Sequence, residues 1–269
     1  MIIKKISTAL IATLILTTAG CGRGQQISTI EGCTIAVTEA PRSSTDSRIT
    51  TLIAEGRKAV DSIKAPIIGH ASMTLEVKSP ESPLMNFAAD ALLAEARRHT
   101  NEKIDIAITN KGGLRSEITE GAITFGDIYN VFPFENTLVT LTLNGRQLLE
   151  LFGEIAREGG EPISGAHIQI TDEGTASKCL SAKVGREILP TDPDELQKRE
   201  YRIATSDYLA QGNDGLGTLA DGYNRKEYKI TLRDLMINHI SSLEKSGKSV
   251  SATTDHRIKK IVPTDKKAE

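Results

Sequence analysis

The 269-residue sequence predicts a mixed α/β (α+β) fold, a single domain with layered helices and mixed sheets. Three observations support this fold class. Stretches with apolar residues at helical spacing interleave with short apolar stretches typical of strands. Several predicted strands follow one another directly, which favours mixed sheets over a doubly wound parallel sheet. The composition, with 39% hydrophobic and 25% charged residues, is ordinary for a globular protein.

The first segment is typical of an export signal rather than of a folded element. Lys4 and Lys5 precede an apolar stretch that is too short to span a membrane. The stretch ends in "TTAGC", which resembles a bacterial lipobox, although Thr18 stands where leucine is usual. Residues 1–20 are therefore predicted to be a signal peptide, and Cys21 is predicted to carry lipid. An ordinary signal followed by a chance cysteine is the alternative.

Composition sets the remaining boundaries. Residues 21–42 form a polar tether behind the lipidated cysteine, residues 43–262 form the predicted domain, and residues 263–269 form a charged tail expected to be disordered. The chain is expected to be exported and lipid-anchored to a bacterial membrane, on the periplasmic or the cell-surface face. A net charge of −2 without a basic stripe argues against double-stranded nucleic acid as a partner.

Five elements are predicted in the first half of the domain. Residues 44–63 have apolar residues at helical spacing behind a Ser/Asp start, and residues 82–100 form a strongly amphipathic helix. Residues 67–77 are a strand, and residues 104–110 are a short apolar strand of the buried type. A helix-like turn and a Pro-Phe bend then lead to the alternating strand at residues 137–143.

The second half continues the same interleaving. A helix begins at the turn near residue 144 and is closed by a Gly-Gly pair at residue 160. Residues 165–171 and 179–184 are predicted to be a pair of strands. Residues 200–212 form a strand that runs into a loop, and residues 231–247 form the last helix.

The cysteines and histidines carry no recognisable metal motif. Because an exported chain meets an oxidising compartment, a disulfide between Cys33 and Cys179 is one interpretation, and two separate thiols are the other. The five histidines are scattered, without partners at ligand spacing. The sequence contains neither a P-loop nor a GxSxG elbow, so it predicts no metal site and no catalytic residue.

Four loops concentrate residue types that suit a small anionic ligand. They are "NKGGLR" with Asn110 and Arg115, "PFEN" with Phe134 and Asn136, "DYLAQGNDG" with Tyr208 and Asp214, and "KSPE" with Lys78. Two facing loop aromatics can stack on a nucleobase, and a loop carboxylate can accept hydrogen bonds from two sugar hydroxyls. Arginine and lysine bind anions, and an amide can both donate and accept at a base edge.

Each loop also has a plain structural interpretation. A Gly-Gly pair after a strand is most often a turn, and Asp214 within "GNDG" is a common turn residue. A phenylalanine after proline usually fills a core, a loop tyrosine usually packs, and Lys78 by default points into solvent. Taken together, the four loops favour a nucleotide or nucleoside over a peptide or a lipid.

The order of these motifs resembles the C-terminal, nucleotide-recognition domain of the secreted 5′-nucleotidase family. The resemblance rests on "SPLMNFAADALL", "DIAITNKGGLR", "FPFENTLVTLTLNGRQLLELF", "PISGAHI" and "YRIATSDYLAQGNDG", and it covers about residues 43–242. It implies the fold of that domain, which binds the nucleoside part of the substrate. In that family a separate metallophosphoesterase domain carries two metals and performs hydrolysis.

The resemblance implies a role for each loop residue. Phe134 and Tyr208 match the two aromatic residues that stack on the base, the second of which is usually phenylalanine. Asp214 matches the carboxylate that holds the ribose hydroxyls. Asn110 and Arg115 match loop residues that contact the base or phosphate regions.

Other positions are weaker matches or depart from the family pattern. Asn136 matches a base-proximal position of some members. Lys78 stands where the family usually has arginine, so it keeps the positive charge but lacks the planar set of N–H donors of a guanidinium. Lys111 and Asn213 each replace a glycine of the family pattern.

The metal-binding motifs of the catalytic half do not occur, and the segment before residue 43 is too short to hold that half. The chain alone is expected to be inactive. The predicted function is a lipid-anchored nucleotide-recognition domain that acts with a separately encoded metallophosphoesterase in nucleotide catabolism, with the divalent metals on that partner. A non-enzymatic nucleoside- or nucleotide-binding lipoprotein and a degenerate scaffold domain are the alternatives.

Overall fold

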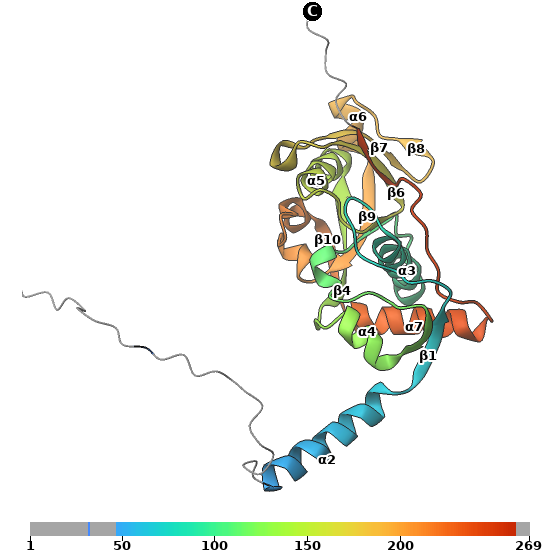
Figure 1. Ribbon diagram of the computed structural model, residues 1–269. Coiled ribbons are helices and arrows are strands. Elements are labelled where there is room, and N and C mark those ends of the chain that lie inside the picture. The colour runs from blue at the N-terminus through green and yellow to red at the C-terminus, as the bar shows by residue number, and fades with distance from the viewer. Residues whose placement is uncertain (1–31, 33–46, 262–269) are drawn as a thin grey trace, which may run out of the picture. The chain divides into compact units, whose positions relative to one another are not determined.

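A five-stranded sheet forms the centre of the fold, in the order β10-β4-β9-β2-β5 (Figure 1). The computed structural model describes residue 32 and residues 47–261. The strands are β2 (Ile106–Ile108), β4 (Thr137–Asn144), β5 (Ile163–Ser164), β9 (Glu200–Ser206) and β10 (Tyr223–Thr231). β2 and β9 are parallel and the other neighbours antiparallel, so the predicted mixed sheet is confirmed.

Two smaller sheets accompany the central one. The four-stranded sheet has the order β11-β6-β7-β8, and the predicted pair of strands is confirmed as β6 and β7, which are antiparallel. A two-stranded sheet joins β1 and β3. The bounds are β1 (Ile67–Ala71), β3 (Gly121–Thr124), β6 (Ala166–Thr171), β7 (Cys179–Val184), β8 (Glu187–Ile188) and β11 (Ile258–Ile261).

Six α-helices lie within residues 47–261: α2 (Ser47–Lys64), α3 (Pro83–Thr100), α4 (Phe125–Val131), α5 (Gly145–Arg157), α6 (Pro193–Lys198) and α7 (Leu232–Lys245). The helices begin where the sequence supplies caps. The Ser82 side chain accepts a hydrogen bond from the backbone amide of Met85, and Asn144 forms a capping box with Gln147 at the start of α5. No helix of the described residues is long and apolar enough to cross a bilayer.

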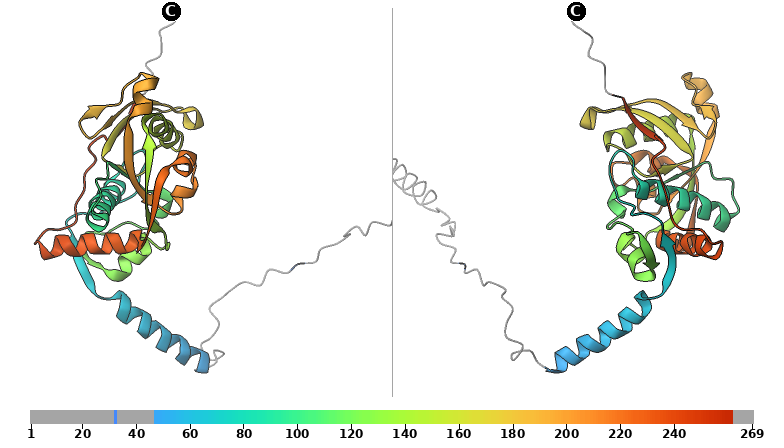
Figure 2. Two further views of the ribbon diagram at one scale, coloured as in Figure 1. Left: turned by 180° about the vertical axis from the view of Figure 1, so that it is seen from behind. Right: turned by 45° about the vertical axis from the view of Figure 1, so that its right-hand side comes forward.

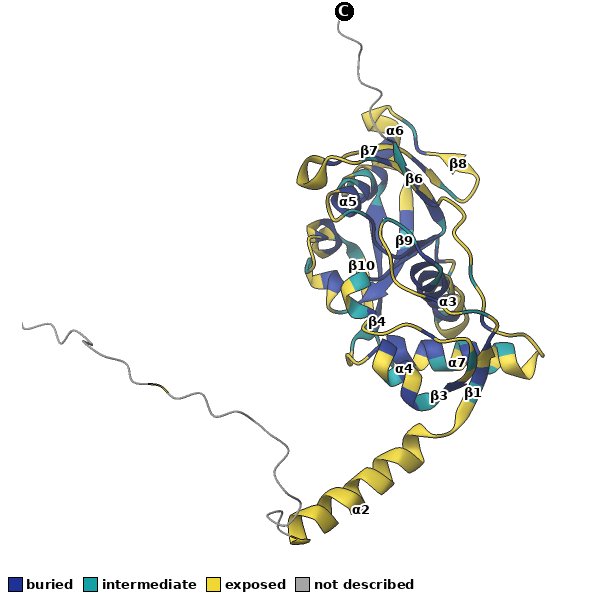
Figure 3. Cartoon of the chain, in the orientation of Figure 1, coloured by how far each residue is buried: buried dark blue, intermediate teal, exposed yellow. Residues whose placement is uncertain are grey.

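The central sheet separates two apolar cores. Successive residues of a strand point to opposite faces, and β2 follows this rule. Ala107 lies in a core built with α3, α4 and α7, whereas Ile106 and Ile108 lie in a core built with α5, β6 and β9. α3 packs against α7 (Figure 2), and the helix faces that meet the sheet are buried (Figure 3).

The edge strand β10 was not predicted. Its sequence, "YNRKEYKIT", is mostly polar, and most of its residues are exposed or half-buried, so it lacks the apolar pattern of an inner strand. Hydrogen bonds to Glu102 connect this edge strand to the rest of the sheet. The Glu102 carboxylate accepts hydrogen bonds from Lys226 Nζ at 2.6 Å, Arg202 Nε at 2.8 Å and the Tyr228 hydroxyl at 3.0 Å.

These contacts predict an acid-sensitive contribution to stability. Burial acts to raise the pKa of Glu102, but the hydrogen bonds from Lys226 and Arg202 outweigh it and lower the pKa to about 2. Because the folded pKa lies below the usual 4.5, the carboxylate stabilises the fold above pH 4.5, by about 1 kcal/mol after solvent screening, and this contribution disappears as the pH falls towards 2.

The variant Glu102→Gln tests this contribution. Its free energy of unfolding, from urea titrations, should lie below that of the unchanged chain at pH 6 and converge with it between pH 4.5 and 2. A difference that stays constant through this window would contradict the assignment.

The predicted helix at residues 44–63 is confirmed from Ser47 onwards as α2, none of whose residues is buried, and residues 44–46 lie outside the described residues. The signal peptide, Cys21, the tether, Cys33 and the charged tail lie outside the described residues. Cys179 has a half-buried free thiol that donates to the Ser181 carbonyl at 3.4 Å, and burial raises its pKa to about 11. The Cys33–Cys179 disulfide therefore stays a prediction.

Candidate functional site

One cavity of about 320 Å³ brings together six of the seven predicted binding residues. It is lined by Asn110, Gly112, Arg115, Phe134, Asn136, Tyr208 and Asp214. These residues come from three loops that are far apart in the sequence and meet near the ends of β2, β4 and β9. The volume is at the lower end of the range for small-molecule sites, which suits a nucleoside-sized ligand.

The first loop is a tight turn at the end of β2. Asn110 precedes the single 3₁₀ turn η2 (Lys111–Gly113). A β-carbon on Gly113 would lie 2.7 Å from Asn110 Oδ1, so glycine is needed for the Asn110 side chain to fold back over the turn. No residue of η2 has a positive φ, so Lys111 occupies the turn without left-handed backbone strain.

The Lys111 side chain braces this turn. Its ammonium forms an ion pair with Glu161 and donates to the Glu158 carbonyl at 2.8 Å. The Lys111 amide donates to the same Glu161 carboxylate at 2.6 Å. Burial raises the pKa of Glu161, which is 3% exposed, while its contacts with Lys111 act to lower that pKa. Lys111 is therefore a support of the Asn110 loop, and it does not line the cavity.

The second loop presents an exposed aromatic ring. Phe134 is 48% exposed, whereas Phe132, two residues earlier, is only 6% exposed and belongs to the core formed with α3 and α7. The expectation that a phenylalanine after proline fills a core therefore does not hold for Phe134. Asn136 follows at the start of β4, and its carbonyl accepts the amide of Leu232 at 2.9 Å.

A buried arginine, which was not predicted from the sequence, supports this second loop. Arg233 lies near the start of α7 and is 3% exposed. Its guanidinium stacks 3.8 Å from the centre of the Tyr129 ring, donates to the Phe132 carbonyl at 3.1 Å and forms an ion pair with Glu135. A lone arginine in the first turn of an amphipathic helix gives no sequence signal for this role.

The third loop places a carboxylate beside a tyrosine. Tyr208 precedes the 3₁₀ turn η4 (Leu209–Gln211) and is 38% exposed. Its hydroxyl donates to Asp214 Oδ1 at 2.8 Å, and this hydrogen bond is the main cause that raises the pKa of Tyr208. Asn110 Nδ2 donates to Asp214 Oδ2 at 2.6 Å. Asn213 Nδ2 donates to the Tyr208 carbonyl at 2.8 Å and so closes the loop.

The two predicted cationic residues have different positions. Arg115 lines the cavity, is exposed, and makes one long hydrogen bond from Nη1 to the Gly112 carbonyl at 3.4 Å. Lys78 is exposed and does not line the cavity. The loop that carries Lys78 contacts another loop at Pro80, whose backbone lies against Gly160. The structure therefore brings six of the seven residues together and leaves Lys78 outside.

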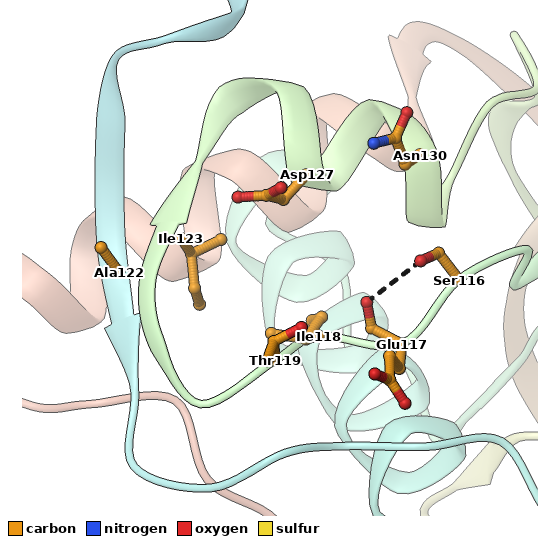
Figure 4. A pocket seen from close by; sticks show the side chains of 8 residues that line it. All are labelled: Ser116, Glu117, Ile118, Thr119, Ala122, Ile123, Asp127 and Asn130. Carbon is orange, nitrogen blue, oxygen red and sulfur yellow. Dashed lines mark hydrogen bonds between the residues drawn. The ribbon is translucent and has the colours of Figure 1, made fainter.

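A second cavity, of about 210 Å³, lies between β3 and α4 (Figure 4). It has no aromatic lining residue. Its Asp127 carboxylate accepts hydrogen bonds from the Thr124 amide at 2.8 Å and the Thr124 hydroxyl at 2.7 Å, which cap α4. In the part of the chain that the structure describes, no group of three or more His, Cys, Asp or Glu side chains could hold a metal ion.

Comparisons with known proteins found similar sequences and one matching family model. The family model described as "5'-nucleotidase, C-terminal domain" matches residues 59–221. The trifunctional nucleotide phosphoesterase protein YfkN of Bacillus subtilis is 28% identical over 228 residues, which are 78% of this chain and 15% of that protein. A probable 5′-nucleotidase of Treponema pallidum is 25% identical, over 79% of this chain and 39% of that protein.

Solved structures show the same likeness. The 5′-nucleotidase precursor of Thermus thermophilus superposes with a TM-score of 0.68 and 25% identity, over 80% of this chain and 43% of that one. The NAD nucleotidase of Haemophilus influenzae superposes with a TM-score of 0.60 at 20% identity, over 81% of this chain and 42% of that one, which supports the fold. The chain spans less than half the length of each of these four relatives.

Proposed function

Because this chain belongs to the family of 5′-nucleotidase C-terminal domains, we propose that it is the nucleotide- or nucleoside-recognition part of a two-chain 5′-nucleotide hydrolase. A separately encoded metallophosphoesterase supplies the divalent metals and the hydrolytic step. The observation that carries the proposal is the cavity in which two exposed aromatic rings, a carboxylate and an arginine meet from three loops.

Each group has a defined task in this proposal. Phe134 and Tyr208 stack on the two faces of the base, and each stacking contact contributes about 1–3 kcal/mol. Asp214 accepts hydrogen bonds from the sugar hydroxyls. Asn136 and Asn110 lie beside the base and the sugar. Arg115 directs the phosphate towards the partner's metals through charge-assisted hydrogen bonds.

The proposal also places the chain at a membrane surface. Lipid on Cys21 would keep the protein at the periplasmic or cell-surface face of the membrane, where it meets exported nucleotides. Replacing Cys21 by serine should release the protein from the membrane fraction and abolish labelling with a radioactive fatty acid. Retention of the label on the Cys21→Ser variant would contradict lipidation at this residue.

Reconstitution tests the enzymatic part of the proposal. The partner to test is a metallophosphoesterase that has no such C-terminal domain of its own, sought first in the neighbouring reading frame. Mixing the two purified proteins should raise kcat/KM for a 5′-nucleotide such as AMP above that of the partner alone. If the two proteins form no complex and kcat/KM does not change, the proposal of a two-chain enzyme is wrong. Calorimetric binding of adenosine or AMP without partner-dependent hydrolysis would support a non-enzymatic binding lipoprotein instead.

The helix α2 offers a surface for this partner. Leu52, Ile53, Val60 and Ile63 are between 47% and 70% exposed, although they are large apolar residues. At 100° per residue they share one face of the helix, and Lys58 lies on the opposite face. Exposed apolar stripes of this kind mark interaction surfaces. The match covers 39% and 43% of two relatives, whose remaining parts have no counterpart in this chain, so we propose that the metallophosphoesterase docks on this stripe.

A paired substitution tests this surface. The variant with Leu52→Asp and Ile63→Asp should weaken association with the metallophosphoesterase at least tenfold, because two carboxylates would be buried in an apolar contact. Lys58→Ala, on the opposite face, is the matched control and should leave association unchanged. Both variants should bind adenosine as the unchanged chain does. If the two variants bind the metallophosphoesterase with equal affinity, α2 does not form the interface.

A further inference from the structure

The carboxylate of Asp214 is already held on both sides before any ligand binds. The Tyr208 hydroxyl donates to Oδ1 at 2.8 Å, and Asn110 Nδ2 donates to Oδ2 at 2.6 Å. The two donors come from different loops, one after β9 and one after β2. They therefore fix the rotation of the carboxylate group about its own bond, which is otherwise free at an exposed aspartate.

The two hydrogen bonds leave room for two more. Each carboxylate oxygen has two acceptor sites, so each keeps one after the internal bond is made. A vicinal cis-diol carries two hydroxyl donors on adjacent carbons and can give one to each oxygen. A 2′-deoxy sugar has only one of these donors and leaves the second acceptor site unmatched.

The surrounding backbone holds all three groups in place. Asp214 has a φ of 54°, a left-handed conformation that aspartate tolerates, and it is followed by Gly215 with a φ of 74°. Asn213 ties the Asp214 loop to the Tyr208 carbonyl at 2.8 Å. On the other side, Glu161 holds the amide and the ammonium of Lys111, the residue next to Asn110.

We propose that the Tyr208 hydroxyl is a positioning group for a ribose subsite. Together with Asn110 it presets Asp214, so that the free acceptor site on each oxygen receives the 2′- and the 3′-hydroxyl of a ribonucleoside. The chain therefore selects ribonucleosides over 2′-deoxyribonucleosides, and Tyr208 contributes through its hydroxyl as well as its ring. This inference rests on the proposed nucleoside binding, in which Asp214 already holds the sugar, and adds the positioning role of the Tyr208 hydroxyl.

Tyr208→Phe separates the hydroxyl from the ring. Calorimetry on the full chain would compare adenosine, 2′-deoxyadenosine and adenine, with the guanine series measured in parallel. In the unchanged chain adenosine should bind about tenfold more tightly than 2′-deoxyadenosine. The substitution should weaken adenosine binding about five- to tenfold, weaken 2′-deoxyadenosine about twofold, and leave adenine within twofold, because the ring still stacks.

Two further variants keep the result interpretable. Tyr223→Phe is the matched control, because the Tyr223 hydroxyl also donates to a carboxylate, Glu200 Oε1, at 2.7 Å, and lies outside the cavity. It should change no affinity. In the Asp214→Asn background, Tyr208→Phe should have no additional effect on adenosine, since the carboxylate that it positions has been removed. The thermal midpoint of each variant shows that it is folded.

The outcomes distinguish this inference from the proposed function. If the unchanged chain binds none of the nucleosides, both are overturned. If it binds adenosine and Tyr208→Phe leaves that affinity unchanged or raises it, the hydroxyl is no positioning group and the inference alone is overturned. The same holds if the substitution weakens adenosine, 2′-deoxyadenosine and adenine equally, because a uniform loss reflects the ring.

Discussion

Replacing Phe134 by alanine is expected to weaken nucleoside binding roughly 5- to 150-fold in Kd, since one base–aromatic stack contributes about 1–3 kcal/mol. The ring is 48% exposed beside the cavity, so its surface is available to a base. The loop that carries it is held by Arg233, which donates to the Phe132 carbonyl at 3.1 Å. The substitution should therefore remove the contact without moving the loop. Calorimetry with adenosine measures the loss.

The control for this prediction is an exposed apolar residue far from the cavity in the sequence. Ile188 is 73% exposed on β8, and Ile188→Ala should change neither adenosine affinity nor thermal stability by a measurable amount. Phe134→Ala should also keep the thermal midpoint of the unchanged chain, because little of its ring packs in the core. Unchanged binding by Phe134→Ala, in a chain that binds adenosine, would show that the base stacks elsewhere.

Replacing Gly160 by alanine is expected to destabilise the fold by about 3 kcal/mol or more. Gly160 has a φ of 109°, which L-residues rarely adopt, and a β-carbon there would lie 2.2 Å from the backbone oxygen of Pro80. The Gly160 carbonyl also accepts from Lys111 Nζ at 3.3 Å, so a shift of this loop disturbs the support of Asn110. Denaturant titration and adenosine calorimetry should therefore both change.

Gly159 supplies the matched control on the same loop. It also has a positive φ, 74°, but nothing lies within 4 Å of a β-carbon built there. Gly159→Ala should lower the free energy of unfolding by only about 1–2 kcal/mol, which is the cost of a left-handed backbone conformation for an L-residue. It should leave adenosine binding unchanged. The difference between the two variants in free energy of unfolding measures the destabilisation caused by the close approach to Pro80. Equal losses for both would show that backbone conformation alone decides the effect.

The residues that line the cavity were predictable to the extent that loop composition is informative. Phe134, Tyr208 and Asp214 stand in polar, glycine-containing loops, where aromatic and acidic side chains have no core to fill, and all three line the cavity. Lys78 was predicted from its charge and from its match to a position where the family usually has arginine, but a position along the chain does not determine distance in space. Its loop ends outside the cavity, beside Gly160.

The supporting residues could not be predicted in the same way. Glu161 and Arg233 are charged residues that would normally be assigned to the surface, and each is 3% exposed because a partner from another part of the chain neutralises it. Such a pair is created by the approach of two segments. Neither residue has a local pattern that distinguishes it from a solvated one.

The sequence by itself determined the fold class, most of the inner strands and long helices, and the loops whose residues line the cavity. It could do so because periodicity, caps and turn residues act over a few neighbouring positions. The tertiary structure alone decided that β10 closes the sheet, that Lys111 is a brace, and that Tyr208 and Asn110 share Asp214. These facts depend on contacts between segments 50 to more than 100 residues apart, and local sequence does not encode such distances.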